Sequence, residues 1–209
     1  MERSAARSPG PGVAHPPGRV VLGGRPCIGY WPGGGLGGQT VDQGIDSLVL
    51  SLREMGKVAA DNELMLSVEI EPPFAFNTID HLIRLIDGAD HASVRAMFDP
   101  SHFDVMSGGR GRPHELLERL GVHRVGYVHF TDSDGTLHGG TSKHLPAGAG
   151  HIDLERSMQV LWEGGFDGWR MIDTWMTPDP YEAGRRGRLA IETFRRNAGR
   201  RAGGSGLGR

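Results

Sequence analysis

The chain has 209 residues, with 23 basic and 25 acidic side chains and a formal net charge of −2. This near balance gives no indication of nucleic acid or an anionic membrane as a partner, and no stretch has the roughly 18 apolar residues of a membrane-spanning helix. The single cysteine, Cys27, cannot form an internal disulfide. A reducing compartment is therefore the simplest expectation, and we expect a cytoplasmic protein.

Both ends of the chain are rich in glycine and lack apolar periodicity. Such segments do not bury enough apolar surface to offset the entropy lost on ordering. We therefore expect disordered tails at 1–18 and 199–209, with a single folded domain at 19–198 between them.

Between the tails, helical and strand periodicities alternate regularly. In chain order we expect a strand region at 19–31, a helix at 41–60, a strand at 64–70, a helix at 77–87 ended by Gly88, a strand at 93–99, a helix at 113–120, a strand at 124–130, a long polar loop at 131–152, a helix at 153–163, a strand at 168–173 and a helix at about 180–197. This alternation requires parallel strands joined by helical crossovers. A closed eight-stranded barrel typically takes about 250 residues, so the chain forms an open sheet or an incomplete barrel.

Four of these strands end in or beside a side chain that can bind a divalent metal: Glu69, Asp99, His129 and Asp173. Since parallel strands bring their carboxyl ends to one edge of the sheet, we expect the four side chains to meet there. Three carboxylates and a histidine make a mostly oxygen site that suits Mn, Mg, Co or Zn. Glu71 shares the strand parity of Glu69 and stays an alternative ligand.

Further residues near these strand ends are candidates for binding a substrate. His102 lies three residues after Asp99, so the pair can aim one group at a metal and the other at a ligand. Lys143 and His144 lie in the long loop, which has the length of a functional lid, and Trp175 can stack on a sugar face. The alternative interpretation is structural: a solvated loop for Lys143 and His144, and a core position for Trp175.

The chain resembles the sugar phosphate isomerase/epimerase superfamily, the xylose isomerase-like TIM barrels. The resemblance covers about residues 20–195 and rests on the segments VEIEPPFAFNT, MFDPSHFDVMSG, YVHFTDSDGT, PAGAGHID and GWRMIDTWMTPDPYEA. It implies an α/β fold, an incomplete (β/α)8 TIM barrel with about the last five βα units. Segments that resemble the first three strands are missing from the sequence.

The resemblance also implies one divalent metal ion (Mn, Co, Mg or Zn) bound by Glu69, Asp99, His129 and Asp173, with His102 on a substrate oxygen. The implied activity is that of a sugar or polyol isomerase or epimerase, with Glu69 and Asp173 moving a proton next to a carbonyl. The family usually has Glu where this chain has the shorter Asp173.

Three alternatives stay open beside the isomerase interpretation. A metal-dependent dehydratase of a cyclic polyol shares the first chemical step, and a truncated remnant would at most bind metal. Metal-dependent phosphodiester cleavage ranks last, because the near-neutral chain indicates no basic groove. We expect a small sugar or polyol as the partner, no nucleic acid and no membrane, and we leave a homo-oligomer open.

Overall fold

A computed structural model describes residues 26–33 and 35–204; the expected tail at 1–18 lies outside these ranges. Within the described residues, five parallel strands form one sheet in the order β1-β2-β3-β4-β7. The strands are β1 (Cys27–Tyr30), β2 (Met65–Val68), β3 (Val94–Phe98), β4 (Val125–Phe130) and β7 (Trp169–Ile172). This half-barrel confirms the predicted fold class.

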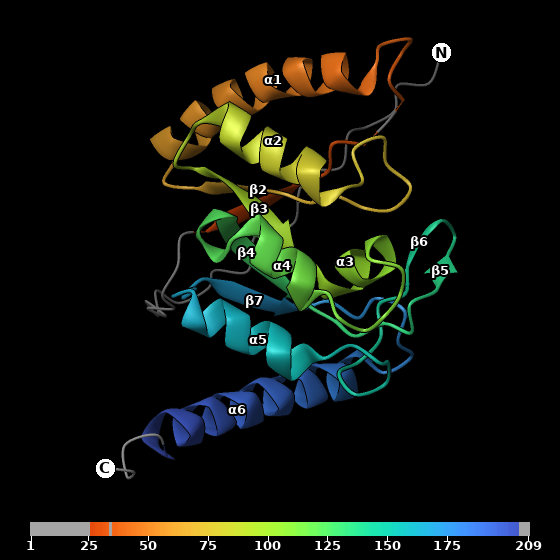
Figure 1. Cartoon of the computed structure of the whole chain (residues 1–209), viewed down its shortest axis with the longest axis vertical. Helices are drawn as coiled ribbons and strands as arrows, with labels where there is room; N and C mark the ends of the chain where they lie inside the picture. Colours follow the sequence, from red (N-terminus) through yellow and green to blue (C-terminus); the bar gives the residue numbers. More distant parts are fainter. Residues whose placement is uncertain (1–25, 34, 205–209) are drawn as a thin grey trace, which may run out of the picture.

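Helices connect the strands and follow the curve of the sheet (Figure 1). Those between strands are α1 (Val41–Asp61), α2 (Ile79–Ala89), α4 (His114–Leu120) and α5 (Leu154–Glu163), and α6 (Pro180–Gly204) follows the last strand. Each helix in this series packs against the next. A short 3-10 turn, η1 (Val122–Arg124), lies between α4 and β4. None of the helices in the described ranges is both long and apolar enough to cross a membrane.

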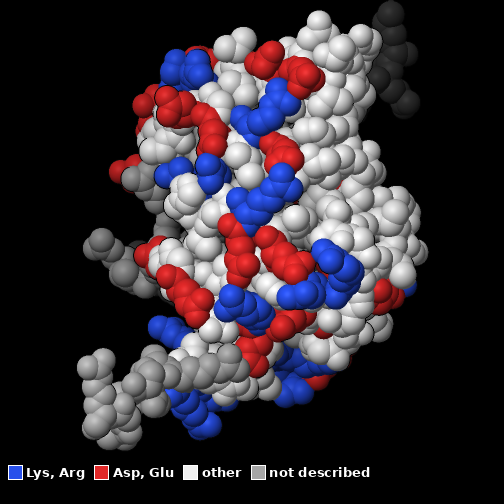
Figure 2. Space-filling model, in the orientation of Figure 1, with Lys and Arg blue, Asp and Glu red and all other residues white. Residues whose placement is uncertain are grey.

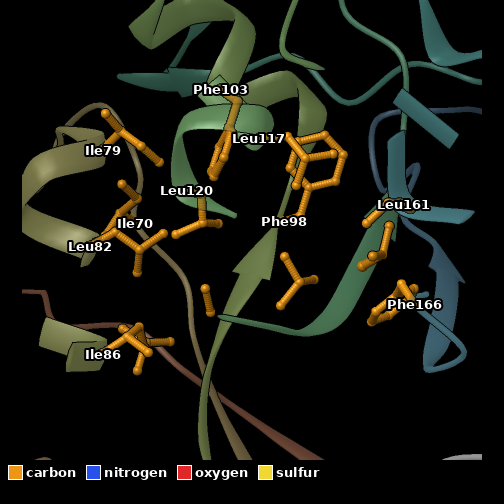
Figure 3. Close-up of a cluster of buried hydrophobic side chains, with 14 of the residues drawn as sticks. Ile70, Ile79, Leu82, Ile86, Phe98, Phe103, Leu117, Leu120, Leu161 and Phe166 are labelled. Carbon is orange, nitrogen blue, oxygen red and sulfur yellow. The ribbon is translucent and has the colours of Figure 1, made fainter. Parts of the chain in front are cut away.

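Alternation along the strands divides the sheet into two faces. One parity packs under the helices: Val68, Phe98 and Phe130 are at most 2% exposed there, and Leu82 of α2 and Leu161 of α5 are fully buried against them. Figure 3 shows this core, with labels on Ile70, Ile79, Leu82, Ile86, Phe98, Phe103, Leu117, Leu120, Leu161 and Phe166. Burying such a side chain contributes roughly 1.5–3 kcal/mol. Side chains of the other parity point away from this core and can form a binding site.

Ion pairs join neighbouring helices on the outer surface. Figure 2 shows basic and acidic side chains interspersed over this face. Arg84 of α2 pairs with Asp42 of α1, and Arg156 of α5 pairs with Glu118 of α4. Exposed pairs of this kind each contribute little, about 0–1 kcal/mol.

Two parts of the chain contain structure that the sequence analysis did not predict. The first is α3 (Pro100–Met106), which begins directly after β3 because Asp99 caps it and Pro100 occupies the first helical position. The second is the loop at 131–152, which holds a hairpin of β5 (Leu137–His138) and β6 (Thr141–Ser142).

Two predicted helix ends differ from the structure. Gly88 does not end α2, which continues to Ala89 and stops at Asp90, whose φ of 46° is left-handed. A Cβ on Gly88 would lie 2.7 Å from Cγ2 of Val49, so this glycine permits close packing of α1 on α2. The helix α6 reaches Gly204, so residues 199–204 are helical where we expected the start of the C-terminal tail.

Candidate metal centre

The four predicted ligands lie at the carboxyl edge of the sheet. Glu69, Asp99 and Asp173 directly follow β2, β3 and β7, and His129 is the second-last residue of β4. The structure brings the four side chains together, as the strand-end argument predicts.

Three carboxylate oxygens converge on a single nitrogen of this cluster. The Nδ1 atom of His129 lies 2.9 Å from Oε1 of Glu69, 3.2 Å from Oδ2 of Asp99 and 3.3 Å from Oδ2 of Asp173. The side chains of Glu69 and Asp99 are 2% and 1% exposed, whereas that of Asp173 is 18% exposed. Asp173 is therefore the carboxylate of the cluster that a ligand in solution reaches most easily.

The pKa shifts in the cluster show that its buried carboxylates favour a positive charge beside them. Burial lowers the pKa of His129, but its hydrogen bond with Asp99 and the close carboxylate of Glu69 outweigh burial and raise the pKa to about 11. Burial raises the pKa of Asp99, yet the nearby His102, His144 and His129 bring it well below its usual range. Buried carboxylates are costly unless a cation neutralises them, and a bound metal ion would do so.

One oxygen of Glu69 fits a metal ligand particularly well. The indole Nε1 of Trp31 donates to Oε2 of Glu69, so that oxygen has a partner. Oε1 is buried and has no hydrogen-bond partner among the described residues, because its short contact with Nδ1 of His129 lacks hydrogen-bond geometry. The ligand atoms of Glu69, Asp99 and His129 lie within 4.8 Å of one another. An orphaned buried oxygen in such a group is the position that a metal ion would satisfy.

Two further histidines extend the cluster. Nδ1 of His144 lies 3.0 Å from Oδ2 of Asp173, and its Nε2 lies 3.9 Å from Oδ2 of Asp99. The His102 and His144 rings meet edge to face with centroids 5.0 Å apart. Burial lowers the pKa of His144, and the charges of Asp99 and Asp173 raise it above its usual value. His102 and His144, both predicted to bind substrate, therefore lie beside the candidate metal ligands.

The hairpin β5–β6 is attached to this edge of the sheet by side-chain hydrogen bonds. Thr141 Oγ1 donates to Oε2 of Glu71 at 2.7 Å, and Ser142 Oγ lies 2.6 Å from Nδ1 of His102. Glu71 thus has a structural partner, which favours Glu69 as the ligand. Glu71 still lies close enough to Glu69 and His102 to form a metal-binding group.

A cavity of about 630 Å³ opens in front of the cluster. Its lining residues are Cys27, Gly29, Trp31, Glu69, Glu71, Met97, His102, Tyr127, His129, Thr141, His144, Met171, Asp173 and Trp175. Trp31 and Trp175 are each 58% exposed at its rim. Lys143 is not among the lining residues: its Nζ pairs with Oδ2 of Asp134 at 2.7 Å. The structure thus brings every predicted site residue to the cavity or cluster except Lys143.

Trp31, Ser101 and Ser142 also contact the candidate site residues, and no prediction from the sequence included them. Trp31 had a usable signal, since it directly follows a strand just as Glu69 and Asp99 do. The Gly139-Gly140 pair was a local signal for the hairpin that carries Ser142. The contacts of the two serines with Asp99 and His102 had no such signal, because they join segments that are distant in the sequence.

Known proteins share this architecture. A family model described as xylose isomerase-like TIM barrel matches residues 20–195. Among curated proteins, an inosose dehydratase of Clostridium botulinum (strain Alaska E43 / Type E3) is 28% identical over 161 residues, which cover 69% of this chain and 53% of that protein. The chain thus spans about half the length of the curated relatives it matches.

Solved structures agree with the family match. A D-tagatose 3-epimerase-like protein superposes with a TM-score of 0.68 at 21% identity, covering 85% of this chain and 64% of that one. The IOLI protein, solved with a bound zinc atom, superposes with a TM-score of 0.61 at 20% identity, covering 82% of this chain and 60% of that one. At these identities the likeness shows the fold. Together with the family match, it establishes that the chain belongs to the xylose isomerase-like TIM-barrel family.

Proposed function

We propose that this chain binds one divalent metal ion through Glu69, Asp99, His129 and Asp173 and acts on a sugar or polyol as an isomerase or epimerase. The observation that carries the proposal is the convergence of three carboxylate oxygens on Nδ1 of His129 in a buried cluster beside a cavity. When bound, such an ion polarises carbonyl and hydroxyl oxygens of a substrate.

The residues of this chain would divide the remaining work. Asp173, the more exposed carboxylate, would take a proton from a carbon next to the substrate carbonyl. Glu69 is the second proton-transfer residue, and the Trp31 indole on its Oε2 fixes its orientation. His102 and His144 bind substrate hydroxyls, and the exposed ring of Trp175 covers an apolar face of the sugar.

The charge of the cavity favours a neutral substrate. Glu69, Glu71 and Asp173 line it, and Asp99 lies behind them. Within the described ranges, no lysine or arginine lines the cavity to pair with a phosphate, since Lys143 pairs with Asp134 instead. We therefore infer an unphosphorylated sugar or polyol, because a phosphate beside these carboxylates would be repelled.

A second candidate reaction is the dehydration of a cyclic polyol. The 28% identity to an inosose dehydratase favours it. Both reactions begin with removal of a proton next to a carbonyl, so the same carboxylates serve either one. The third candidate is a remnant that binds metal without turnover; the two edge strands of the described sheet, β1 and β7, which each pair with one neighbour, favour it.

Deuterium exchange tests the shared proton-transfer step. Protein loaded with Mn²⁺ or Mg²⁺ is incubated in D₂O with D-tagatose or with an inosose, and mass spectrometry follows deuterium next to the carbonyl. Exchange that is lost in Asp173→Asn but kept in Lys143→Ala supports the enzyme, and the product formed separates epimerase from dehydratase. Metal-loaded, folded protein that exchanges no deuterium into either substrate leaves the non-catalytic remnant.

A further inference from the structure

A chain of buried hydroxyl groups connects a metal-ligand carboxylate to the back of the His102 ring. Ser101 Oγ lies 2.6 Å from Oδ1 of Asp99, Ser142 Oγ lies 2.8 Å from Ser101 Oγ, and Nδ1 of His102 lies 2.6 Å from Ser142 Oγ. All four residues are at most 2% exposed. The contacts are short and shielded from water, so every proton in the chain needs a defined place.

The protons of this chain can be assigned from one end. Oδ1 of Asp99 already accepts from the backbone N–H groups of Ser101 and His102, so it acts as an acceptor and the Ser101 hydroxyl donates to it. A serine hydroxyl has a single proton. The contact between the two serines therefore requires Ser142 to donate to Ser101.

The same count fixes the last contact. Because Ser142 donates its only proton to Ser101, its oxygen can only accept from His102. Nδ1 of His102 must therefore carry a proton. In a neutral imidazole the other nitrogen, Nε2, then has a free lone pair.

The free nitrogen faces the candidate metal centre. Nε2 of His102 lies 3.7 Å from Oε1 of Glu69 and 4.0 Å from Oδ2 of Asp99, too far for a hydrogen bond to either. His102 also lines the cavity. A ligand in the cavity can therefore reach Nε2.

We propose that Ser101 and Ser142 hold His102 as the Nδ1–H tautomer, so that its Nε2 accepts a hydrogen bond from a hydroxyl of the bound sugar or polyol. The proposal rests on the proposed function for the identity of the ligand, but not for the tautomer. It makes Ser142 a positioning residue and gives the hairpin β5–β6 a role in substrate selection. A hydroxyl donates to such a nitrogen, whereas a carbonyl, carboxylate or fully ionised phosphate offers it no proton.

Nitrogen NMR reads the tautomer directly. Protein labelled with ¹⁵N-histidine is loaded with Mg²⁺, which is diamagnetic and prefers oxygen ligands, and two-bond ¹H–¹⁵N correlations are recorded at neutral pH. His102→Gln assigns the His102 signals. The expected wild-type pattern has a protonated Nδ1 and an unprotonated Nε2. A protonated Nε2, in either the other tautomer or the doubly protonated ring, overturns the proposal.

Serine variants test the cause of this tautomer. Ser101→Ala frees the Ser142 proton to point at Nδ1, so the Nε2–H form should appear, and Ser142→Ala should give a mixture of tautomers. Ser142→Thr keeps the hydroxyl and should keep the wild-type pattern. Ser107→Ala is the control, because that hydroxyl donates to the Asp104 carbonyl outside the chain. A wild-type pattern in folded Ser101→Ala overturns the proposal, whether or not the protein shows any turnover.

Discussion

Removing the buried carboxylate of Asp132 should destabilise the protein more than removing an exposed carboxylate from its surface does. The side chain is 1% exposed and accepts four backbone N–H groups. Oδ1 takes those of Ser133 and Ile152 at 2.9 and 3.0 Å, and Oδ2 takes those of Gly148 and Gly150 at 2.9 and 3.0 Å. One side chain thus fixes the course of the segment that follows His144 in the sequence.

The size of the effect follows from these four bonds. A hydrogen bond to a charged group contributes about 1.5–3 kcal/mol, and water reaching the exposed Gly148 and the half-buried Gly150 would offset part of the loss. We expect Asp132→Ala to lower the free energy of unfolding by about 4–6 kcal/mol, a large share of the roughly 5–15 kcal/mol of a typical domain. Asp132→Asn keeps one acceptor oxygen but turns an amide NH₂ toward two donors, so we expect about 2–3 kcal/mol.

Urea unfolding measures this loss, with Asp134→Asn as the matched control. Asp134 lies two residues away, but its side chain is 40% exposed, so its loss should cost less than about 1 kcal/mol. The backbone of Asp132 also pairs with Leu145 in both directions, at 2.9 Å each. His144 precedes Leu145 and contacts Oδ2 of Asp173, a proposed metal ligand. Metal affinity should therefore also fall in the Asp132 variants, because this segment loses its support. If Asp132→Ala costs no more than Asp134→Asn, the reasoning from buried hydrogen bonds is refuted.

Two further predictions concern substrate binding and pH. Trp175→Ala should raise KM roughly two- to tenfold through lost stacking, whereas Lys143→Ala should leave KM unchanged, since Lys143 faces Asp134; steady-state kinetics showing the reverse would contradict the cavity assignment. Hydrogen bonds from Arg124 lower the pKa of Asp87, so this pair stabilises the fold above the unfolded-state pKa and ceases to do so as pH falls through the folded value. After allowance for solvent screening, Asp87→Asn should cost at most about 1 kcal/mol at neutral pH and nothing in acid, and urea unfolding that shows equal losses at both pH values would contradict this.

The sequence predicted the strands and the meeting of the candidate ligands at one sheet edge for one physical reason. Buried parallel strands are short apolar runs, and a polar residue directly after such a run lies at the carboxyl edge. Glu69, Asp99 and Asp173 all obey this rule. Asp99 has two contacts that the sequence did not distinguish: its Oδ1 caps α3, and its Oδ2 faces the other candidate ligands.

The remaining features depend on contacts between distant segments. Neighbours in an extended segment point to opposite sides, so local sequence does not say which of Lys143 and His144 faces inward. The bridge between Asp132 and Leu145 sets that choice and turns His144 toward Asp173. The hairpin has a local signal, since the left-handed pair Gly139-Gly140 forms its two-residue turn. Its position, with Ser142 beside His102, depends on contacts with α3 and not on local pattern.

The metal content of the purified, dialysed protein tests the central claim most directly. Elemental analysis is done in parallel on wild type, on His129→Ala and on His138→Ala, a control histidine exposed in the hairpin. We expect one divalent ion per chain in wild type and in His138→Ala, and loss of that ion in His129→Ala, because the carboxylates converge on Nδ1 of His129. Folded wild-type protein that retains no metal, even after addition of Mn²⁺, Co²⁺, Mg²⁺ or Zn²⁺, would contradict it.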